Sequence, residues 1–123
     1  MSETEAQRRG RLAETAAAQD LAARGYQIIE RNARILPYGE IDLIAGRDNR
    51  LLFTEVKARR SNDYGGGAAA ITAAKIGRMY RTAQAWLKAH HKMNKEIYFL
   101  AAIVRLNQQG KPEQIDYEPI DWF

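Results

Sequence analysis

Two short runs of sequence place acidic and basic side chains on segments that are otherwise apolar. The runs are GEIDLIA at residues 39–45 and FTEVKARR at residues 53–60, and both have the composition of β-strands. The GRDNR segment between them, residues 46–50, is typical of a turn. The two runs therefore predict one β-hairpin, which determines where the charged side chains meet.

A turn centred on residues 48 and 49 sets the register of this hairpin. Three pairs then lie directly opposite each other: Asp42 and Glu55, Glu40 and Lys57, and Ile44 and Phe53. Because side chains alternate between the two faces of a strand, the remaining apolar positions share the other face, which we predict to be the core face. These positions are Ile41, Leu43, Ala45, Leu52, Thr54 and Val56.

The predicted pairing of Asp42 with Glu55 is unfavourable, because like charges at directly opposed strand positions repel. A divalent cation between the two carboxylates would remove that repulsion, and Mg²⁺ commonly takes one or two carboxylates from a protein. Lys57 would then lie beside the cation on the same face. A second interpretation treats the face as solvated, with Glu55 and Lys57 forming an ordinary surface ion pair.

Two helices are predicted outside the hairpin. The first covers residues 2–24, with a capping box at Ser2 and Glu5, and it carries Glu14 at the flank of its apolar stripe. The stripe consists of Ala13, Ala17 and Leu21. Glu14 is then either a solvated helix glutamate or a third carboxylate for the charged end of the hairpin.

The second helix is predicted over residues 69–90. Its apolar arc consists of Ile71, Ile76, Met79, Ala83, Trp86 and Leu87. Lys75 falls inside this arc, so its ammonium either extends along the edge of the core to water or reaches the hairpin and contacts phosphate. Arg78 lies off the arc, where it is solvated or steers phosphate.

The composition restricts the class of protein. A length of 123 residues suits one domain, and the absence of cysteine excludes disulfides and thiolate metal sites. The N-terminus has no apolar secretion signal and no uncharged run is long enough to cross a membrane, so we expect a cytoplasmic protein without a membrane partner. A net charge of +4 favours an anionic partner such as nucleic acid.

The spacing of Asp42, Glu55 and Lys57 resembles the PD-(D/E)XK nuclease superfamily, in which an Asp on one strand precedes Asp or Glu, any residue, and Lys on the next. With a Glu on an N-terminal helix and a Lys on a later helix, the two runs also resemble the YraN-type family of small bacterial proteins. The resemblance covers nearly the whole chain from about Arg9. That family is usually described as predicted endonucleases, distantly similar to archaeal Holliday-junction resolvases.

This resemblance implies an α/β fold, a single restriction-endonuclease-like domain with an αβββαβ core and a mixed central sheet flanked by helices. The predicted order of elements agrees, with strands at 26–33, in the hairpin and at 96–106, and an edge strand at 114–118. The domain would cover residues 1–123, with 1–4 as a candidate for disorder and 60–70 as a flexible loop. Trp122 and Phe123 would pack as a lid or mark a subunit contact.

The resemblance also implies a metal-dependent endonuclease that uses Mg²⁺ or Mn²⁺ on branched or structured DNA, with a homodimer as the expected assembly. The implied roles are catalysis for Asp42, Glu55, Lys57 and Glu14, metal binding for Asp42, Glu55, the Val56 carbonyl and Glu14, and phosphate contact for Lys75, Arg59, Arg60 and Arg78. The alternative is a non-catalytic nucleic-acid-binding or scaffolding protein that keeps the same fold and basic surface.

Overall fold

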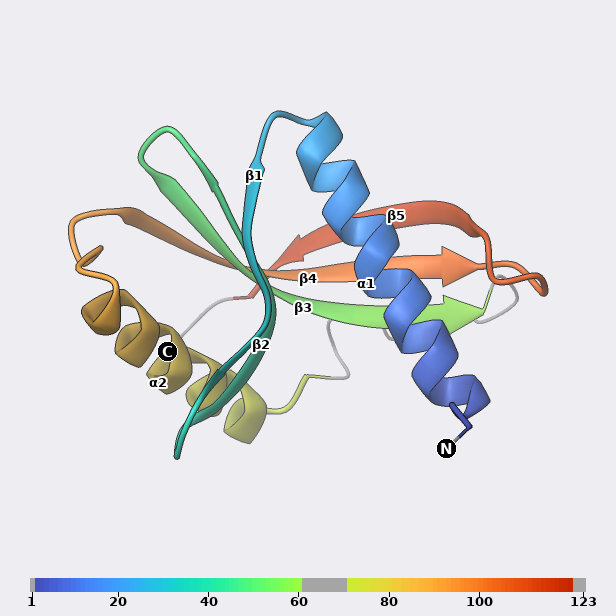
Figure 1. The fold of residues 1–123 in the computed structure, drawn as a ribbon, viewed down its shortest axis with the longest axis horizontal. Helices are drawn as coiled ribbons and strands as arrows, with labels where there is room; N and C mark the ends of the chain where they lie inside the picture. Colours follow the sequence, from blue (N-terminus) through green and yellow to red (C-terminus); the bar gives the residue numbers. More distant parts are fainter. Residues whose placement is uncertain (1, 61–70, 121–123) are drawn as a thin grey trace.

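The computed structural model describes residues 2–60 and 71–120, so the predicted 60–70 loop, apart from Arg60, and the predicted packing of Trp122 and Phe123 lie outside the described residues. The helices and strands follow the predicted order (Figure 1). They are α1 (Glu5–Ala23), β1 (Gln27–Ile35), β2 (Gly39–Arg47), β3 (Arg50–Arg60), α2 (Ala73–Ala89), β4 (Glu96–Leu106) and β5 (Pro112–Pro119). The first six elements are the predicted αβββαβ core, and β5 extends it by one strand.

The described strands form one mixed sheet in the order β1-β2-β3-β4-β5. Every neighbouring pair is antiparallel except β3 and β4, which run parallel from Arg50–Glu96 to Arg60–Leu106. Parallel neighbours need a crossover connection, and the segment that contains α2 supplies it. The predicted α/β class with a mixed central sheet is confirmed.

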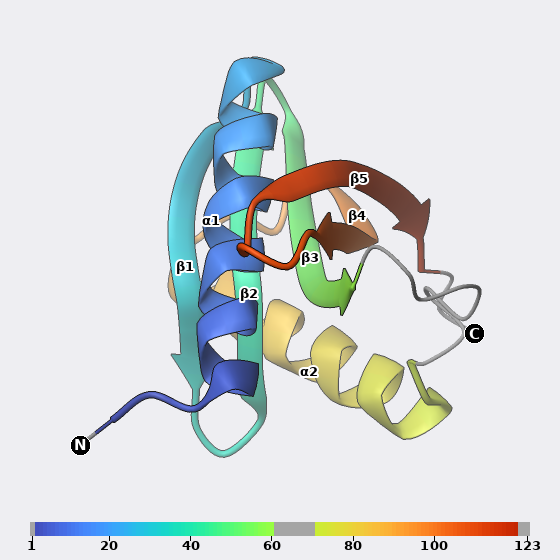
Figure 2. The same cartoon turned by 90° about the vertical axis from the view of Figure 1, so that its right-hand side faces the viewer.

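The two helices cover opposite faces of the sheet (Figure 2). The predicted stripe of α1 is buried, and it packs on strand residues that include Leu43, Ala45 and Leu52. On the other face, α2 buries Met79, Ala83, Trp86 and Leu87 against residues that include Ile44, Phe53 and Ile103. Both faces of the sheet are therefore largely apolar, and charged side chains on β2 and β3 stand out as exceptions.

Trp86 is the largest fully buried side chain among residues 2–60 and 71–120. Its ring meets the ring of Phe53 edge-on with centroids 5.7 Å apart, and its Nε1–H donates to Glu30 Oε1 at 3.0 Å. A buried indole N–H that lacked a partner would cost stability, so Glu30 on β1 serves the core and not the charged pocket described below.

The start of each helix differs from the prediction. The capping box of α1 is formed by Thr4 and Gln7, not by Ser2 and Glu5: Thr4 Oγ1 accepts the Gln7 N–H at 3.1 Å, and Gln7 Oε1 accepts the Thr4 N–H at 2.9 Å. Both residue pairs have the capping-box spacing, and Thr4 is the residue with the extended backbone that an N-cap requires. Likewise α2 begins after Thr72, whose hydroxyl caps the helix, so Ile71 precedes the helix.

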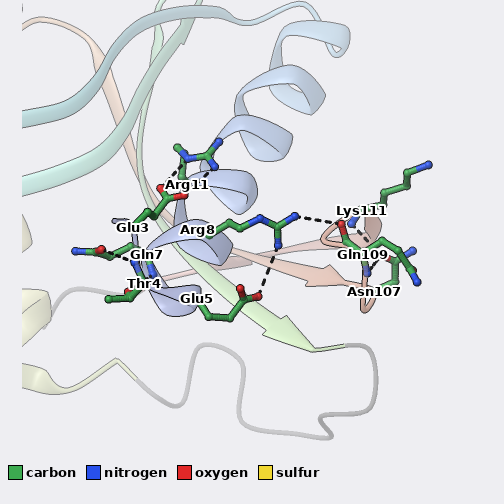
Figure 3. A network of polar contacts seen from close by, with 9 residues as sticks. All are labelled: Glu3, Thr4, Glu5, Gln7, Arg8, Arg11, Asn107, Gln109 and Lys111. Atoms are coloured by element: carbon green, nitrogen blue, oxygen red, sulfur yellow. Dashed lines mark hydrogen bonds and ion pairs between the residues drawn. The ribbon is translucent and has the colours of Figure 1, made fainter. Parts of the chain in front are cut away.

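The first turns of α1 are joined to the turn between β4 and β5 (Figure 3). Arg8 donates to the Gln109 carbonyl at 3.5 Å and lies 3.6 Å from the Glu5 carboxylate. Asn107 shapes that turn, because its Oδ1 accepts the backbone N–H groups of Gln109 and Lys111 at 2.9 Å each. These contacts fix the position of α1 along the sheet.

In the described residues, neither helix is both long and apolar enough to cross a membrane.

Candidate active site

The ladder between β2 and β3 ends early, and Asp42 occupies the point where the strands separate. Backbone pairing runs in the predicted register, including Ile44 with Phe53, and stops at Leu43 with Thr54. The predicted pairs Asp42 with Glu55 and Glu40 with Lys57 are therefore wrong as ladder pairs. Beyond the last pair, Oδ2 of Asp42 accepts the Val56 N–H at 2.8 Å, so a carboxylate takes the place of the missing strand acceptor.

Asp42 and Glu55 nevertheless face the same side of the sheet. Both line an open pocket of about 290 Å³ on the side covered by α2. The residues that line it come from β2, β3, α2 and the segment before α2, and they are Gly39, Glu40, Asp42, Glu55, Ile71, Lys75, Arg78 and Met79. The pocket thus combines three carboxylates, two cationic side chains and an apolar wall.

Burial and the neighbouring negative charge of Glu55 raise the pKa of Asp42 from 3.8 to about 7, in that order of importance. The Val56 N–H opposes this shift, while the charges of Glu14 and Glu40 add to it. Among the described residues, Asp42 is therefore the carboxyl group that the fold makes hardest to ionise. Groups with strongly shifted pKa values in a pocket are candidates for a functional site.

Two ammonium groups meet at one oxygen of Glu55. Lys57 Nζ lies 3.3 Å from Oε1, and Lys75 Nζ lies 3.8 Å from the same atom. The Lys57 ammonium, followed by burial, lowers the pKa of Lys75, while the charges of Glu55 and Asp42 partly offset that effect. The Lys75 ammonium therefore reaches the hairpin and does not extend along the edge of the core to water, which was the other predicted arrangement.

Lys75 is also fixed at the start of α2. Its backbone N–H donates to the Thr72 hydroxyl at 3.2 Å, which caps the helix. No acidic residue lies in the first turn of α2, and the partial positive charge of a helix N-terminus disfavours a cation there. The carboxylate of Glu55 offsets that cost. A bound phosphate could serve the same end, because it would meet both the helix N-terminus and the lysines.

Glu14 approaches the cluster from the other helix. Burial raises its pKa, and the charges of Glu40 and Glu55 add to this, against a hydrogen bond from Asn32 and the charge of Arg31. Glu14 thus lies near enough to influence the pocket, but its side chain is directed to β1. Its implied role as a metal ligand stays a prediction.

Asn32 is a residue that sequence reasoning missed. It has a φ of 51° within β1, between the pairs Arg31–Leu43 and Ala33–Ile41, and is therefore level with Asp42. At this level the side chains of β2 switch from one face of the sheet to the other, because Leu43 packs under α1 whereas Ile41 packs under α2. The prediction that Ile41 and Leu43 share one core face is therefore wrong. Left-handed backbone inside a strand is uncommon, although Asn tolerates it better than most residues. No sequence pattern signals it here.

The predicted phosphate contacts divide into two groups. Arg78 and Lys75 line the pocket, whereas Arg59 and Arg60 lie at the far end of β3. Arg59 donates to the Ala58 carbonyl at 3.1 Å, and its partner in the parallel register is Arg105 on β4. A cation directly beside a cation is an unusual sheet pairing, and Arg105 was not predicted. Arg105 lies beside Arg59 only because of the parallel β3–β4 register, which could not be predicted from the sequence.

The side chains available in the pocket decide which kind of site it can offer to the implied Mg²⁺ or Mn²⁺. In residues 2–60 and 71–120, no three His, Cys, Asp or Glu side chains are arranged to hold one metal ion. Asp42 and Glu55 supply two carboxylates, which is the protein contribution that a largely hydrated Mg²⁺ commonly requires. The pocket therefore fits an ion that keeps most of its water. The Val56 carbonyl as a further ligand stays a prediction.

Comparison with known sequences places the chain in a family. The sequence model of the uncharacterised protein family UPF0102 matches residues 13–113. This chain belongs to the UPF0102 family. The matched segment contains the hairpin, the pocket and both helices except for the first turns of α1. Membership of the predicted YraN-type family is thereby confirmed, while the likeness to nucleases and resolvases stays a prediction.

Relatives within UPF0102 come from several different bacteria. A UPF0102 protein of Parafrankia sp. is 40% identical over 104 residues, which is 85% of this chain and 87% of the relative. One from Syntrophomonas wolfei is 42% identical over 86 residues, 70% of this chain and 74% of the relative. One from Nitrobacter winogradskyi is 51% identical over 81 residues, 66% of each chain. The names of these relatives state the family and no activity.

Proposed function

We propose that this UPF0102 protein is a metal-dependent endonuclease that hydrolyses phosphodiester bonds in branched or structured DNA. The observation that carries the proposal is the pocket in which Asp42 and Glu55 lie together while two lysines meet at Glu55. A fold that only needed stability would gain by replacing a partly buried carboxyl group whose pKa is raised to about 7. A site that takes a cation and a phosphate needs this combination of charges.

In this proposal Asp42 and Glu55 hold a Mg²⁺ or Mn²⁺ ion. When bound, the ion supplies Lewis acidity toward a phosphate oxygen and toward water. The Val56 N–H orients Asp42 by donating to Oδ2, and the second carboxylate oxygen would serve the ion. Lys57, held 3.3 Å from Glu55, donates hydrogen bonds to a phosphate oxygen and stabilises the negative charge that develops there.

Phosphate binding in the proposed complex falls to the cationic side chains. Lys75 and Arg78 of α2 contact the phosphate at the pocket, and Arg59 and Arg60 of β3 contact the backbone further along. Contacts of this kind neutralise charge without reading bases, so affinity should fall steeply with salt and depend little on sequence. A homodimer, as the resolvase resemblance implies, would place two such pockets on one four-way junction.

The decisive experiment combines a substrate series with matched variants. Purified protein is incubated with linear, flapped and four-way-junction DNA and with structured RNA, in Mg²⁺, in Mn²⁺ and in chelator. Asp42→Asn, Glu55→Gln and Lys57→Ala should each abolish nicking but leave DNA binding in chelator largely intact. Glu113→Gln, an exposed residue of β5, removes one charge away from the pocket and should leave nicking unchanged. Cleavage that persists in chelator, or in all three variants, refutes the mechanism.

A second candidate is a nucleic-acid-binding protein without cleavage activity. The observation that favours it is that Glu55 is already engaged by Lys57 and Lys75, so a cation has to compete with two ammonium groups. In that case the same substrate series gives salt-dependent binding and no nicking under any condition. The intact acidic residues would still bind Mg²⁺ or Mn²⁺ in this second candidate, so the nicking assay separates the two. Isothermal titration that finds no binding of either ion excludes the enzyme.

A further inference from the structure

The turn between β1 and β2 exposes two large apolar side chains. Leu36 is 73% exposed and Tyr38 is 44% exposed. The turn is closed by the Tyr38 N–H, which donates to the Ile35 carbonyl at 2.8 Å. It forms one extremity of the molecule, at the lower edge in both ribbon views (Figures 1 and 2). The tip therefore projects apolar surface to where a partner can reach it.

The base of this tip is clamped on α2. Gly39 has a φ of 148°, and a Cβ there would lie 3.1 Å from Thr82 Oγ1 and 3.2 Å from Arg78 Cγ and Cδ. Thr82 is 1% exposed and its hydroxyl donates to the Arg78 carbonyl at 2.7 Å, so the surface that receives Gly39 is itself fixed. Ile35, on the other side of the turn, packs against the core under α2. The backbone of the tip is thus fixed before any partner binds, which lowers the entropic cost of binding.

The tip is also continuous with the pocket. Gly39 and Glu40, the two residues after Tyr38, line the pocket together with Asp42 and Glu55. Cations flank it, since Arg34 is exposed on β1 and Arg78 packs against Gly39. An apolar and aromatic tip with cations at its base matches a nucleic acid, in which base faces are apolar and the surrounding backbone is anionic.

We propose that Leu36 and Tyr38 form a wedge that stacks on an exposed base pair at a branch point in the nucleic acid. This inference rests on the proposed function only in taking nucleic acid as the ligand. The wedge defines the substrate class as structures with an open end of base stacking, and it places the backbone next to the branch at the pocket that Gly39 and Glu40 line. Linear duplex offers no such surface except at its ends.

A second copy of the chain is the competing occupant of the tip. Two side chains at a narrow turn offer far less surface than the roughly 800 Å² per partner that a stable protein interface buries. A single stacked base pair, by contrast, needs no more area than one aromatic ring and its neighbour provide. The size of the exposed patch therefore favours a base over a subunit.

The test measures binding in chelator, where the proposed cleavage does not proceed. A four-way junction and a linear duplex carry 2-aminopurine next to the branch point or at the matching internal position, and affinities are measured for the wild-type chain and the Leu36→Ala/Tyr38→Ala variant. The variant should bind the junction at least about fivefold more weakly, because stacking a base on an aromatic side chain contributes about 1–3 kcal/mol. Its affinity for duplex should be unchanged, and its junction complex should lose the change in 2-aminopurine fluorescence.

Tyr98→Ala is the matched control, because Tyr98 on β4 is also 44% exposed and is not among the residues that line the pocket. It should bind both DNAs like the wild-type chain. Equal loss of affinity in the two variants, or equal junction and duplex binding by the wild type, overturns the wedge. Dimerisation by sedimentation velocity that disappears in the tip variant also overturns it, in favour of self-association. Tip-dependent junction binding without any metal-dependent nicking would leave the wedge standing and refute the nuclease.

Discussion

Asp42 should make this protein less stable as the pH rises, and Asp42→Asn should remove that dependence. The folded-state pKa of about 7 lies above the ordinary value of 3.8, so the fold favours the protonated carboxyl group. Between these two values the unfolded chain releases a proton that the folded chain keeps, and stability falls as the pH rises through this range. Below about pH 4 both states are protonated and the penalty is absent.

The size of the effect follows from the separation of the two pKa values. About 3 pH units at about 1.4 kcal/mol each give an upper bound of about 4 kcal/mol. Asp42 shares the charge interaction with Glu55 and keeps partial contact with water, so we expect about 2–4 kcal/mol. Asn can still accept the Val56 N–H through its amide oxygen, and the hydrogen bond need not be lost.

The assay is urea unfolding at pH 4, 6 and 8 without divalent metal. Asp42→Asn should match the wild type at pH 4 and exceed it increasingly at pH 6 and 8. Asp48→Asn is the control, because it makes the same chemical change in the β2–β3 turn, where φ is 53° and Asn is well tolerated. If both variants show the wild-type pH dependence, or if Asp42→Asn is destabilised at pH 8, the account of Asp42 is wrong.

Three further predictions concern the metal and two partly buried hydrogen bonds. Saturating Mg²⁺ should raise the melting temperature more at pH 8 than at pH 5, since protonation of Asp42 competes with the ion. A chelator should reverse this rise. A rise that survives in the Asp42→Asn variant would mean that the ion binds elsewhere. Tyr117→Phe should lower the free energy of unfolding in urea by about 1 kcal/mol at pH 7 and by less at pH 3. The Tyr117 hydroxyl, 2.7 Å from Asp20, is the main cause of the lowered pKa of that carboxyl group, so its stabilising effect is lost as the pH falls. An equal loss of stability at both pH values would contradict this prediction. Trp86→Phe should lower the free energy of unfolding by about 1–3 kcal/mol, since the variant loses both core volume and the donor to Glu30, and a urea midpoint equal to that of the wild type would contradict the role given to this contact.

The parts of the fold that were predictable from sequence depend on local periodicity. The stripe of α1, the arc of α2 and the pairing of Ile44 with Phe53 each follow from side-chain spacing within one element or one tight hairpin. The juxtaposition of Asp42 and Glu55 in one pocket follows from the same hairpin, although the two are not ladder partners.

The parts that were not predictable depend on contacts between distant segments. The β2–β3 ladder ends at Leu43 and Thr54, and the local sequence carries no sign of this early end. The parallel register that brings Arg105 beside Arg59 joins segments separated by a helix. The left-handed Asn32 and the clamp on Gly39 likewise depend on where α1 and α2 pack. Sequence reasoning thus finds the acidic pair and misses the surroundings that orient it.

The parallel pairing of β3 with β4 has a consequence for when the site can form. β3, which carries Glu55 and Lys57, pairs with β4 along its whole length from Arg50 to Arg60. The segment that contains α2 lies between these two strands in the sequence. Closing so long a connection is slow compared with forming a hairpin. A chain emerging from the ribosome can therefore form the β2–β3 hairpin early, whereas the β4 neighbour of Glu55 and Lys57 is complete only after Leu106 has been added.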